Sequence, residues 1–269
     1  MTVPVVLTIA GSDSGAGAGI QADLKTFAAL GVYGVTVITA ITAQNTVGVR
    51  AVQEMVPDVI TAQLDAVAED FSIAALKTGM LSSAAIIETV VAGLRRHALS
   101  PLVVDPVMIA KSGDRLLRED AVDTLRRSLL PLAHVVTPNI PEAELLTGFT
   151  IRTHADRVAA GRAIMELGAH AVVIKGGHSD EDPIVDLLVD SEGVHEFCAA
   201  RVATGSTHGT GCTFSAAIAA ALGRGQGLAT AVGEARAYLS SALAEAPGLG
   251  HGHGPVNHFP SRQVAHAHH

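Results

Sequence analysis

Short runs of β-branched residues alternate along the chain with longer segments of helical periodicity. The runs predict six strands, at 5–11, 34–42, 73–79, 101–107, 134–139 and 171–177. The segments between them predict helices at 20–31, 58–68, 82–97, 119–128, 142–146 and 155–168. Alternation of this kind is typical of a doubly wound α/β domain with a mostly parallel sheet.

The last third of the chain predicts a hairpin and two helices. Residues 184–198 alternate around Ser191-Glu192-Gly193, which indicates two strands joined by a tight turn. The helices follow at about 211–223 and 228–245. Because no repeat or linker-like segment interrupts the pattern, we predict one domain over 1–259 and a His-rich tail at 260–269. In such sheets, ligands bind beyond the carboxyl ends of the strands, where the polar and Gly-rich segments fall.

Composition narrows the class of protein. Apolar residues make up 48% of the 269 residues and aromatic residues only 3%, so the core must consist of Val, Ile, Leu and Ala. A net charge of -8 without a dense Lys/Arg run argues against a nucleic-acid partner. Two cysteines form no disulfide framework, the start VPVVLTIAG has no signal-peptide pattern, and no apolar run reaches the ~20 residues of a membrane span. We therefore expect a cytoplasmic protein with no membrane partner.

The segment His208-Gly209-Thr210-Gly211-Cys212 immediately precedes an Ala-rich helical run. The free N–H groups of a first helical turn and the positive end of the helix dipole form an anion site, and small residues let a phosphate approach closely. The same field lowers the pKa of a thiol, so we expect Cys212 to be a thiolate, a nucleophile or a base. The alternative, a small apolar cap residue, leaves the two glycines unexplained.

A second Gly-rich segment, Gly11 to Asp23, follows the first predicted strand. A dinucleotide fingerprint fits it only in one weak register, and the G-K-[ST] ending of a P-loop does not occur there. A tight strand-to-helix turn is the simpler interpretation. The clustering of Ser12, Asp13 and Asp23 with the glycines favours a close approach to a small ligand instead.

Charged residues stand at three other predicted strand ends. Asp105 and Glu142 are candidates for holding Mg²⁺, which needs only one or two carboxylates besides substrate phosphates. Asn139 and Glu142 fit a helix-capping arrangement equally well. Lys175, followed by two glycines, would be costly to bury without a partner such as a phosphate, unless it extends to solvent.

Two neighbouring amides, Gln44 and Asn45, end the second predicted strand. An amide offers a donor and an acceptor to a heterocycle edge, although either residue could instead cap a turn. With the anion site, the carboxylates and Lys175, they favour a small-molecule kinase, because phosphoryl transfer depends mainly on positioning and charge neutralisation.

The order of these motifs resembles a known family. The segments are TIAGSDSGAGAGIQADLKTFAALGVYGVTVITAITAQNT, KTGML, DPVMIAKSGDRLL, TPNIPEAELLTG, IKGGH, THGTGCTFSAAIAA and GHGHGPVNHF, between about residues 4 and 259. They are similar to the hydroxymethylpyrimidine and phosphomethylpyrimidine kinases of thiamine biosynthesis, members of the ribokinase superfamily. The resemblance implies a three-layer α/β/α sandwich that uses ATP and Mg²⁺ to phosphorylate 4-amino-5-hydroxymethyl-2-methylpyrimidine, and then its monophosphate.

The resemblance also implies residue roles. Gln44 would bind the aminopyrimidine, with Asp23 near its ring or hydroxymethyl arm. The pocket walls would be Gly11, Ala18, Met80 and Val107. Asp105, Asn139 and Glu142 would organise Mg²⁺ and the ATP phosphates, with Lys175, His178 and Thr210 on the nucleotide side. Lys111 would lie in a flap, Gly209, Thr210 and Gly211 would form the anion site, and Cys212 would occupy the general-base position.

One departure and three alternatives bear on this assignment. The first alternative, a non-catalytic binding or regulatory protein, would need no set of carboxylates, lysine and anion site. Thr204-Gly205-Ser206-Thr207 stands where the family often has T-K-N-T, which implies weaker ATP affinity or another basic residue in its place. A pyridoxal-type kinase of the same superfamily is the alternative substrate assignment. A nicotinamide oxidoreductase would need an acidic residue at the end of the second strand, which ends near Gln44 instead. We expect a small-molecule substrate and a homodimer, although the sequence does not define the oligomeric state.

Overall fold

Nine strands pair side by side into one sheet in the order β3-β2-β1-β4-β5-β6-β7-β8-β9. The computed structural model describes residues 3–108, 116–118, 121–178 and 182–261. The strands are β1 (Val5–Asp13), β2 (Tyr33–Gln44), β3 (Val49–Glu54), β4 (Ile73–Thr78), β5 (Leu102–Val104), β6 (Val135–Val136), β7 (Val172–Ile174), β8 (Ile184–Val189) and β9 (Val194–Ala199). Strands β2, β1, β4, β5, β6 and β7 run parallel, whereas β3, β8 and β9 pair antiparallel with their neighbours.

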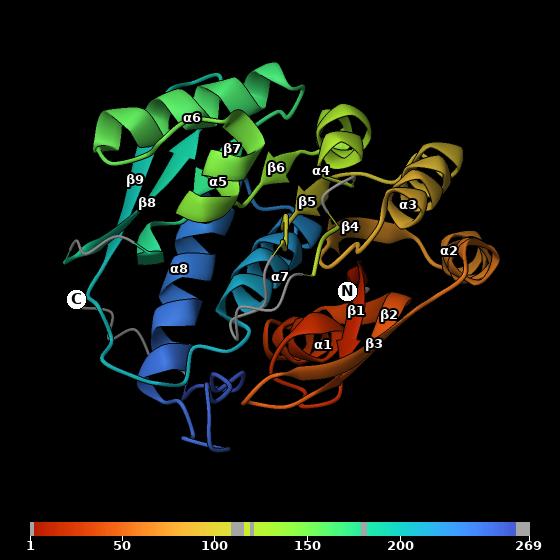
Figure 1. Cartoon of the computed structure of the whole chain (residues 1–269), viewed down its shortest axis with the longest axis horizontal. Helices are drawn as coiled ribbons and strands as arrows, with labels where there is room; N and C mark the ends of the chain where they lie inside the picture. The colour runs from red at the N-terminus through yellow and green to blue at the C-terminus, as the bar shows by residue number, and fades with distance from the viewer. Residues whose placement is uncertain (1–2, 109–115, 119–120, 179–181, 262–269) are drawn as a thin grey trace.

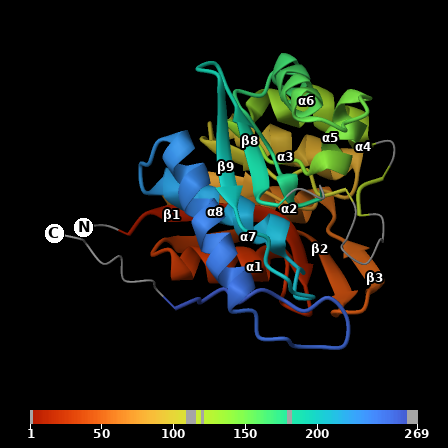
Figure 2. The ribbon, with the colours of Figure 1, turned by 90° about the vertical axis from the view of Figure 1, so that its left-hand side faces the viewer.

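Helices cover both faces of the sheet (Figure 1). They are α1 (Gly19–Ala29), α2 (Pro57–Asp70), α3 (Ala84–Arg96), α4 (Ala121–Thr124), α5 (Ile140–Thr147), α6 (His154–Glu166), α7 (Thr210–Gly223) and α8 (Leu228–Ala244). A short π-helical turn (Leu125–Leu129) and two 3-10 turns (Leu130–Leu132 and Gly176–His178) complete the described elements. Figure 2 shows the blue helices α7 and α8 lying side by side, and α7 also packs against α1.

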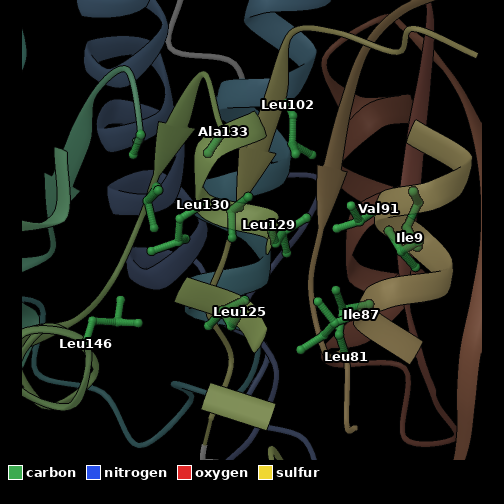
Figure 3. Close-up of a cluster of buried hydrophobic side chains, with 14 of the residues drawn as sticks. Ile9, Leu81, Ile87, Val91, Leu102, Leu125, Leu129, Leu130, Ala133 and Leu146 are labelled. Atoms are coloured by element: carbon green, nitrogen blue, oxygen red, sulfur yellow. The ribbon is translucent and has the colours of Figure 1, made fainter. Parts of the chain in front are cut away.

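Alternation along each strand separates the core into two apolar layers. Leu7, Ile9 and Val104 face the layer under α2, α3 and α6, while Val6 and Val103 face the layer under α1, α7 and α8. Figure 3 shows part of the first layer, where Ile9 of β1 meets Ile87 and Val91 of α3. Both faces of β1, β4, β5, β6 and β7 are largely buried, which explains their continuous apolar runs, whereas β2 carries several exposed residues. The predicted three-layer α/β architecture is confirmed.

Several predicted boundaries are wrong for identifiable reasons. Predicted strands 101–107 and 134–139 are only the short β5 and β6, because Pro106 and Pro138 lack the N–H that a sheet ladder requires. The named strands therefore end before Asp105 and Asn139, so Asp105 stands on a loop and Asn139, which bridges to Lys175, stands at the start of α5, both at the carboxyl edge of the sheet. Strand β3 was not predicted, because its largely exposed side chains give no amphipathic pattern. Predicted helix 119–128 is α4 and the π-helical turn, with 119–120 outside the described residues.

The hairpin predicted at 184–198 is confirmed as β8 and β9. Most of the predicted tail, 262–269, lies outside the described residues. None of the helices in the described ranges combines the length and the apolar character that crossing a membrane requires.

Candidate active site

A cavity of about 560 Å³ lies where the carboxyl ends of the parallel strands meet the start of α7. This volume is typical of sites for small molecules. The cavity brings together nearly all of the predicted site residues, which come from segments distant in sequence. They are Gly11, Ala18, Gln44, Met80, Asp105, Val107, Asn139, Glu142, Lys175, Gly209, Thr210, Gly211 and Cys212. The His178 side chain and Lys111 lie outside the described residues.

The turn over residues 208–212, hereafter the anion turn, begins helix α7. Gly209 is the N-cap with φ of 80°, a left-handed conformation that favours glycine, and no side chain of the described residues caps the turn. Its outward N–H groups and the helix dipole therefore remain available to an anion. A Cβ at Gly211 would lie 3.4 Å from the Lys175 Nζ and 3.5 Å from an Asp105 oxygen, so the anion turn opens directly toward these two charges.

Lys175 is shared by two carboxylates. Its Nζ lies 3.0 Å from Asp105 Oδ1 and 3.8 Å from Glu142 Oε2. Burial lowers the pKa of the Lys175 ammonium, but the charges of Asp105 and Glu142 outweigh burial and raise it, so the side chain is cationic at neutral pH. Lys175 was expected to need a partner if buried, and in the structure its partners are the carboxylates of Asp105 and Glu142.

Glu142 serves a structural and an electrostatic role at once. Its backbone N–H donates to Asn139 Oδ1 at 2.9 Å and its Oε2 accepts from the Asn139 N–H at 2.7 Å, so the capping arrangement predicted as an alternative is present. Burial, together with the nearby charge of Asp105, raises the pKa of the Glu142 carboxyl to about 7, although Lys175 opposes the shift. Two crowded carboxylates of this kind favour an additional cation nearby.

The other end of the cavity carries the predicted acceptor residues. The Thr42 hydroxyl lies 3.0 Å from the Ser12 carbonyl oxygen and 3.1 Å from Gln44 Oε1, so it contacts the Gln44 amide and restricts its orientation. Asn45 instead accepts the N–H groups of Val47 and Gly48, so the turn-capping alternative holds for that residue. A Cβ at Gly11 would lie 3.3 Å from the Met80 sulfur, and glycine therefore lets Met80 pack close to β1.

Asp23 is not among the residues that line the cavity, whereas the resemblance implies a place near the acceptor. Its side chain is fully buried on α1, where Oδ1 pairs with Lys77 Nζ at 2.9 Å and Oδ2 accepts the Thr8 hydroxyl at 2.6 Å. Asp23 faces inward from the helix that follows the Gly-rich turn, so its proximity in sequence to the site was misleading. Its contribution to the site is indirect, through the buried ammonium of Lys77.

Cys212 lines the cavity, and its surroundings act against the thiolate form. Burial raises the pKa of the Cys212 thiol to about 11, with a further increase from Asp23 and Asp105, and Lys77 offsets only part of the shift. The cost of desolvating a thiolate therefore exceeds the stabilisation that Lys77 gives it.

Alkylation should reveal this raised pKa. Because only the thiolate reacts, we expect Cys212 to be modified slowly by iodoacetamide at pH 7 and its rate to rise about tenfold per pH unit up to pH 10. Residue-resolved mass spectrometry can measure both cysteines in one sample, with Cys198, exposed on β9, as the reference. If the alkylation rate of Cys212 has already reached its plateau at pH 7, Cys212 is a thiolate at neutral pH.

Two further pairs in the cavity wall were not predicted. His208 Nε2 lies 2.8 Å from Asp13 Oδ2, and Arg236 Nη1 of α8 lies 3.2 Å from Asp186 Oδ2 of β8. Asp186 also accepts the Gly176 N–H at 2.8 Å, which fixes the backbone beside Lys175. The members of these pairs are separated by 195 and 50 residues in the sequence, so their contact could not be predicted from local patterns. Asp13 and His208 do both lie within Gly-rich segments, which indicated a site there.

A sheet of this topology with a cavity of this kind at its carboxyl edge places the chain among the ribokinase-like kinases of small molecules. The solved ADP complex of a Bacillus subtilis pyridoxal kinase matches it with a TM-score of 0.90 at 39% identity, over 96% of this chain and 98% of that chain. The family model for phosphomethylpyrimidine kinase matches residues 13–257, and the chain belongs to that family.

Relatives of this family match almost the full chain. The hydroxymethylpyrimidine/phosphomethylpyrimidine kinase of Rhizobium meliloti (strain 1021) is 54% identical over 258 residues, covering 95% of this chain and 97% of the relative. The solved phosphomethylpyrimidine kinase of Clostridium difficile 630 is 45% identical, with a TM-score of 0.81 over 90% of this chain and all of that chain. The family resemblance predicted from the motifs is therefore confirmed.

Proposed function

We propose that this chain transfers a phosphoryl group from ATP to 4-amino-5-hydroxymethyl-2-methylpyrimidine, and a second one to the resulting monophosphate, in thiamine biosynthesis. The observation that carries the proposal is the single cavity with an oriented amide, Gln44, at one end and the anion turn facing Lys175 at the other. The 54% identity to a kinase of both pyrimidines supports this choice of substrate.

At the acceptor end, Gln44 hydrogen-bonds the aminopyrimidine edge. Gly11, Ala18, Met80 and Val107 form the walls around the ring. Because the Thr42 hydroxyl contacts the oxygen of the Gln44 amide, the side chain is restricted in orientation before the substrate binds. Pre-orientation of this kind lowers the entropic cost of placing the acceptor oxygen in line with the transferring group.

At the nucleotide end, Lys175 and the N–H groups of the anion turn neutralise the phosphates of ATP. Asn139 and Thr210 line the same part of the cavity. The described residues contain no cluster of three or more His, Cys, Asp or Glu side chains with metal-ligand geometry. Asp105 and Glu142 nevertheless fit Mg²⁺, which takes one or two carboxylates and completes its shell with phosphate and water. When bound there, Mg²⁺ would neutralise charge on the phosphates.

Cys212 stands beside the expected acceptor oxygen as a protonated thiol. With its pKa raised to about 11, it is a poor acceptor of the substrate proton before transfer begins. We assign most of the catalysis to the anion turn and Lys175, because phosphoryl transfer requires little covalent assistance from the protein.

Pyridoxal is the second candidate substrate. Pyridoxal kinases of Bacillus subtilis and Staphylococcus aureus share the fold with a TM-score of 0.90, at 39% and 35% identity. The pyrimidine is favoured because the relatives named for it are closer in sequence.

A coupled assay of ADP release decides between the two substrates. With saturating ATP and Mg²⁺, we expect kcat/KM for the hydroxymethylpyrimidine to exceed that for pyridoxal by at least about tenfold, the scale on which a pocket distinguishes similar rings. A ratio that favours pyridoxal would overturn the substrate assignment. Absence of turnover with both acceptors would overturn the kinase assignment.

The cellular setting of the proposal is cytoplasmic, where ATP is available and the exposed Cys198 would stay reduced. We also expect a homodimer. The exposed apolar side chains Ile41 and Val52 of the edge hairpin β2–β3 support this expectation, and sedimentation would test it.

A further inference from the structure

Asp13 organises the Gly-rich turn, residues 14–18, that borders the acceptor end of the cavity. It ends strand β1, and its carboxylate accepts three N–H groups of that turn. Gly15 donates to Oδ1 at 2.8 Å, while Gly17 and Ala18 donate to Oδ2 at 3.0 and 2.8 Å. The same Oδ2 faces His208 Nε2 at 2.8 Å. One carboxylate therefore connects the Gly-rich turn to the anion turn.

The backbones of the two turns are in direct contact at this pair. A Cβ at Gly209 would collide with the Gly17 carbonyl oxygen, and a Cβ at Gly17 would collide with the His208 ring. The backbone of His208 is also fixed, because its backbone N–H donates to the Gly254 carbonyl oxygen at 3.0 Å. Figure 2 shows the blue segment after α8 that supplies this contact, passing beside the ends of β2 and β3. Glycines thus permit the approach, and the side-chain pair sets its geometry.

The pair is buried in the cavity wall. The exposed fractions of the His208 and Asp13 side chains are 9% and 3%, and both residues line the cavity. Burial raises the pKa of the Asp13 carboxyl, but the hydrogen bonds from His208, Ala18 and Gly15 outweigh it and hold the pKa below its ordinary value. Asp13 is therefore ionised at neutral pH. Because desolvation offsets much of the stability gained from a buried pair, its main consequence is a fixed contact.

We propose that Asp13 and His208 are a positioning pair, which fixes the Gly-rich turn against the anion turn and so sets the distance between the acceptor oxygen and the transferring phosphoryl group. This inference rests on the proposed kinase function. Each half of the cavity can bind its own substrate without the pair, but alignment of the two substrates requires it. Loss of the pair should therefore lower kcat and leave both binding steps nearly unchanged, since misplacement by about 1 Å can cost on the order of 100-fold in rate.

Two amide substitutions at His208 test the pair with little change in polarity. In His208→Gln the amide nitrogen takes the place of Nε2 and can still donate to Asp13, whereas the shorter side chain of His208→Asn cannot reach it. We expect His208→Gln to keep kcat within about fivefold of the unmodified chain and His208→Asn to lose about 100-fold. Equilibrium binding of the pyrimidine and of ATP, measured separately by calorimetry, should stay within about threefold in both variants.

The control is His154→Asn, which breaks a histidine–carboxylate pair of the same chemistry on the surface. His154 Nε2 lies 2.8 Å from Glu196 Oε1, and both side chains are about half exposed. This variant should leave kcat unchanged. Equal kcat for His208→Asn and the unmodified chain, equal losses for the two His208 variants, or a loss confined to binding would each overturn the positioning role. If the unmodified chain itself fails to phosphorylate the pyrimidine, the proposed function fails instead, whatever the variants do.

Discussion

Gly211→Ala should abolish most kinase turnover while leaving the fold intact. The added methyl group would lie 3.4 Å from Lys175 Nζ and 3.5 Å from Asp105 Oδ2, in the space that we assign to the transferring phosphoryl group. Nothing there prevents folding, because these are ordinary contact distances and alanine favours the helix more than glycine. We expect kcat/KM to fall about 10²- to 10³-fold, the scale of losing an oxyanion-type site, and Tm to change by at most ~2 °C.

Two matched variants separate this effect from nonspecific damage. Gly205→Ala adds the same methyl group to the preceding loop, where a Cβ meets nothing within 4 Å, and should leave turnover unchanged. Cys212→Ser keeps the N–H groups of the anion turn and removes only the thiol, so we expect a loss of no more than about tenfold. Full activity of Gly211→Ala would show that the phosphoryl group binds elsewhere. A larger loss in Cys212→Ser than in Gly211→Ala would make the thiol a principal catalytic group.

Lys77→Met should cause the largest loss of stability. Lys77 and Asp23 are both fully buried, with 2.9 Å between Nζ and Oδ1, and burial raises the pKa of Asp23 against the effect of Lys77. Removing the ammonium would leave a buried carboxylate without its counter-charge, which costs about 3–5 kcal/mol. For a chain of this size we expect Tm to fall by roughly 10 °C at pH 7.5, measured by calorimetry.

The pH dependence of Lys77→Met identifies the cause. A raised pKa means that the folded state favours the protonated carboxyl of Asp23, so the deficit should shrink as pH falls and Asp23 takes up a proton. The double variant Asp23→Asn/Lys77→Met removes both charges and should recover most of the lost stability. A deficit that is independent of pH and persists in the double variant would show that packing of the Lys77 stem, rather than its charge, is responsible.

The sequence predicted the location of the site better than its chemistry. Asp105, Lys175 and the anion turn were all found from their places after apolar runs, because parallel strands bring their carboxyl ends to one edge. The burial of Asp23 could not be predicted, because sequence proximity to a Gly-rich turn does not reveal which face of α1 a side chain occupies. Its partner Lys77 is 54 residues away, and its burial follows from tertiary packing alone.

Competing electrostatic effects act on Cys212. The position at a helix start was read correctly, and the helix dipole and Lys77 both favour a thiolate. Burial in the folded chain acts in the opposite direction, and with the charges of Asp23 and Asp105 it outweighs Lys77 and raises the pKa to about 11. The depth of burial depends on how α7 packs against α1 and α8, which periodicity does not specify. The Asp13–His208 pair escaped prediction for a similar reason, since 195 residues separate its members.

The most direct test of the proposed function is to follow the products of a single incubation by mass. The chain, Mg²⁺, excess ATP and 4-amino-5-hydroxymethyl-2-methylpyrimidine should yield first the monophosphate and then the diphosphate, with one ADP released for each phosphoryl group transferred. Both products should depend on the same cavity, so Gly211→Ala should suppress both. ATP consumption without a phosphorylated pyrimidine, or complete absence of the diphosphate, would contradict the proposed pair of reactions.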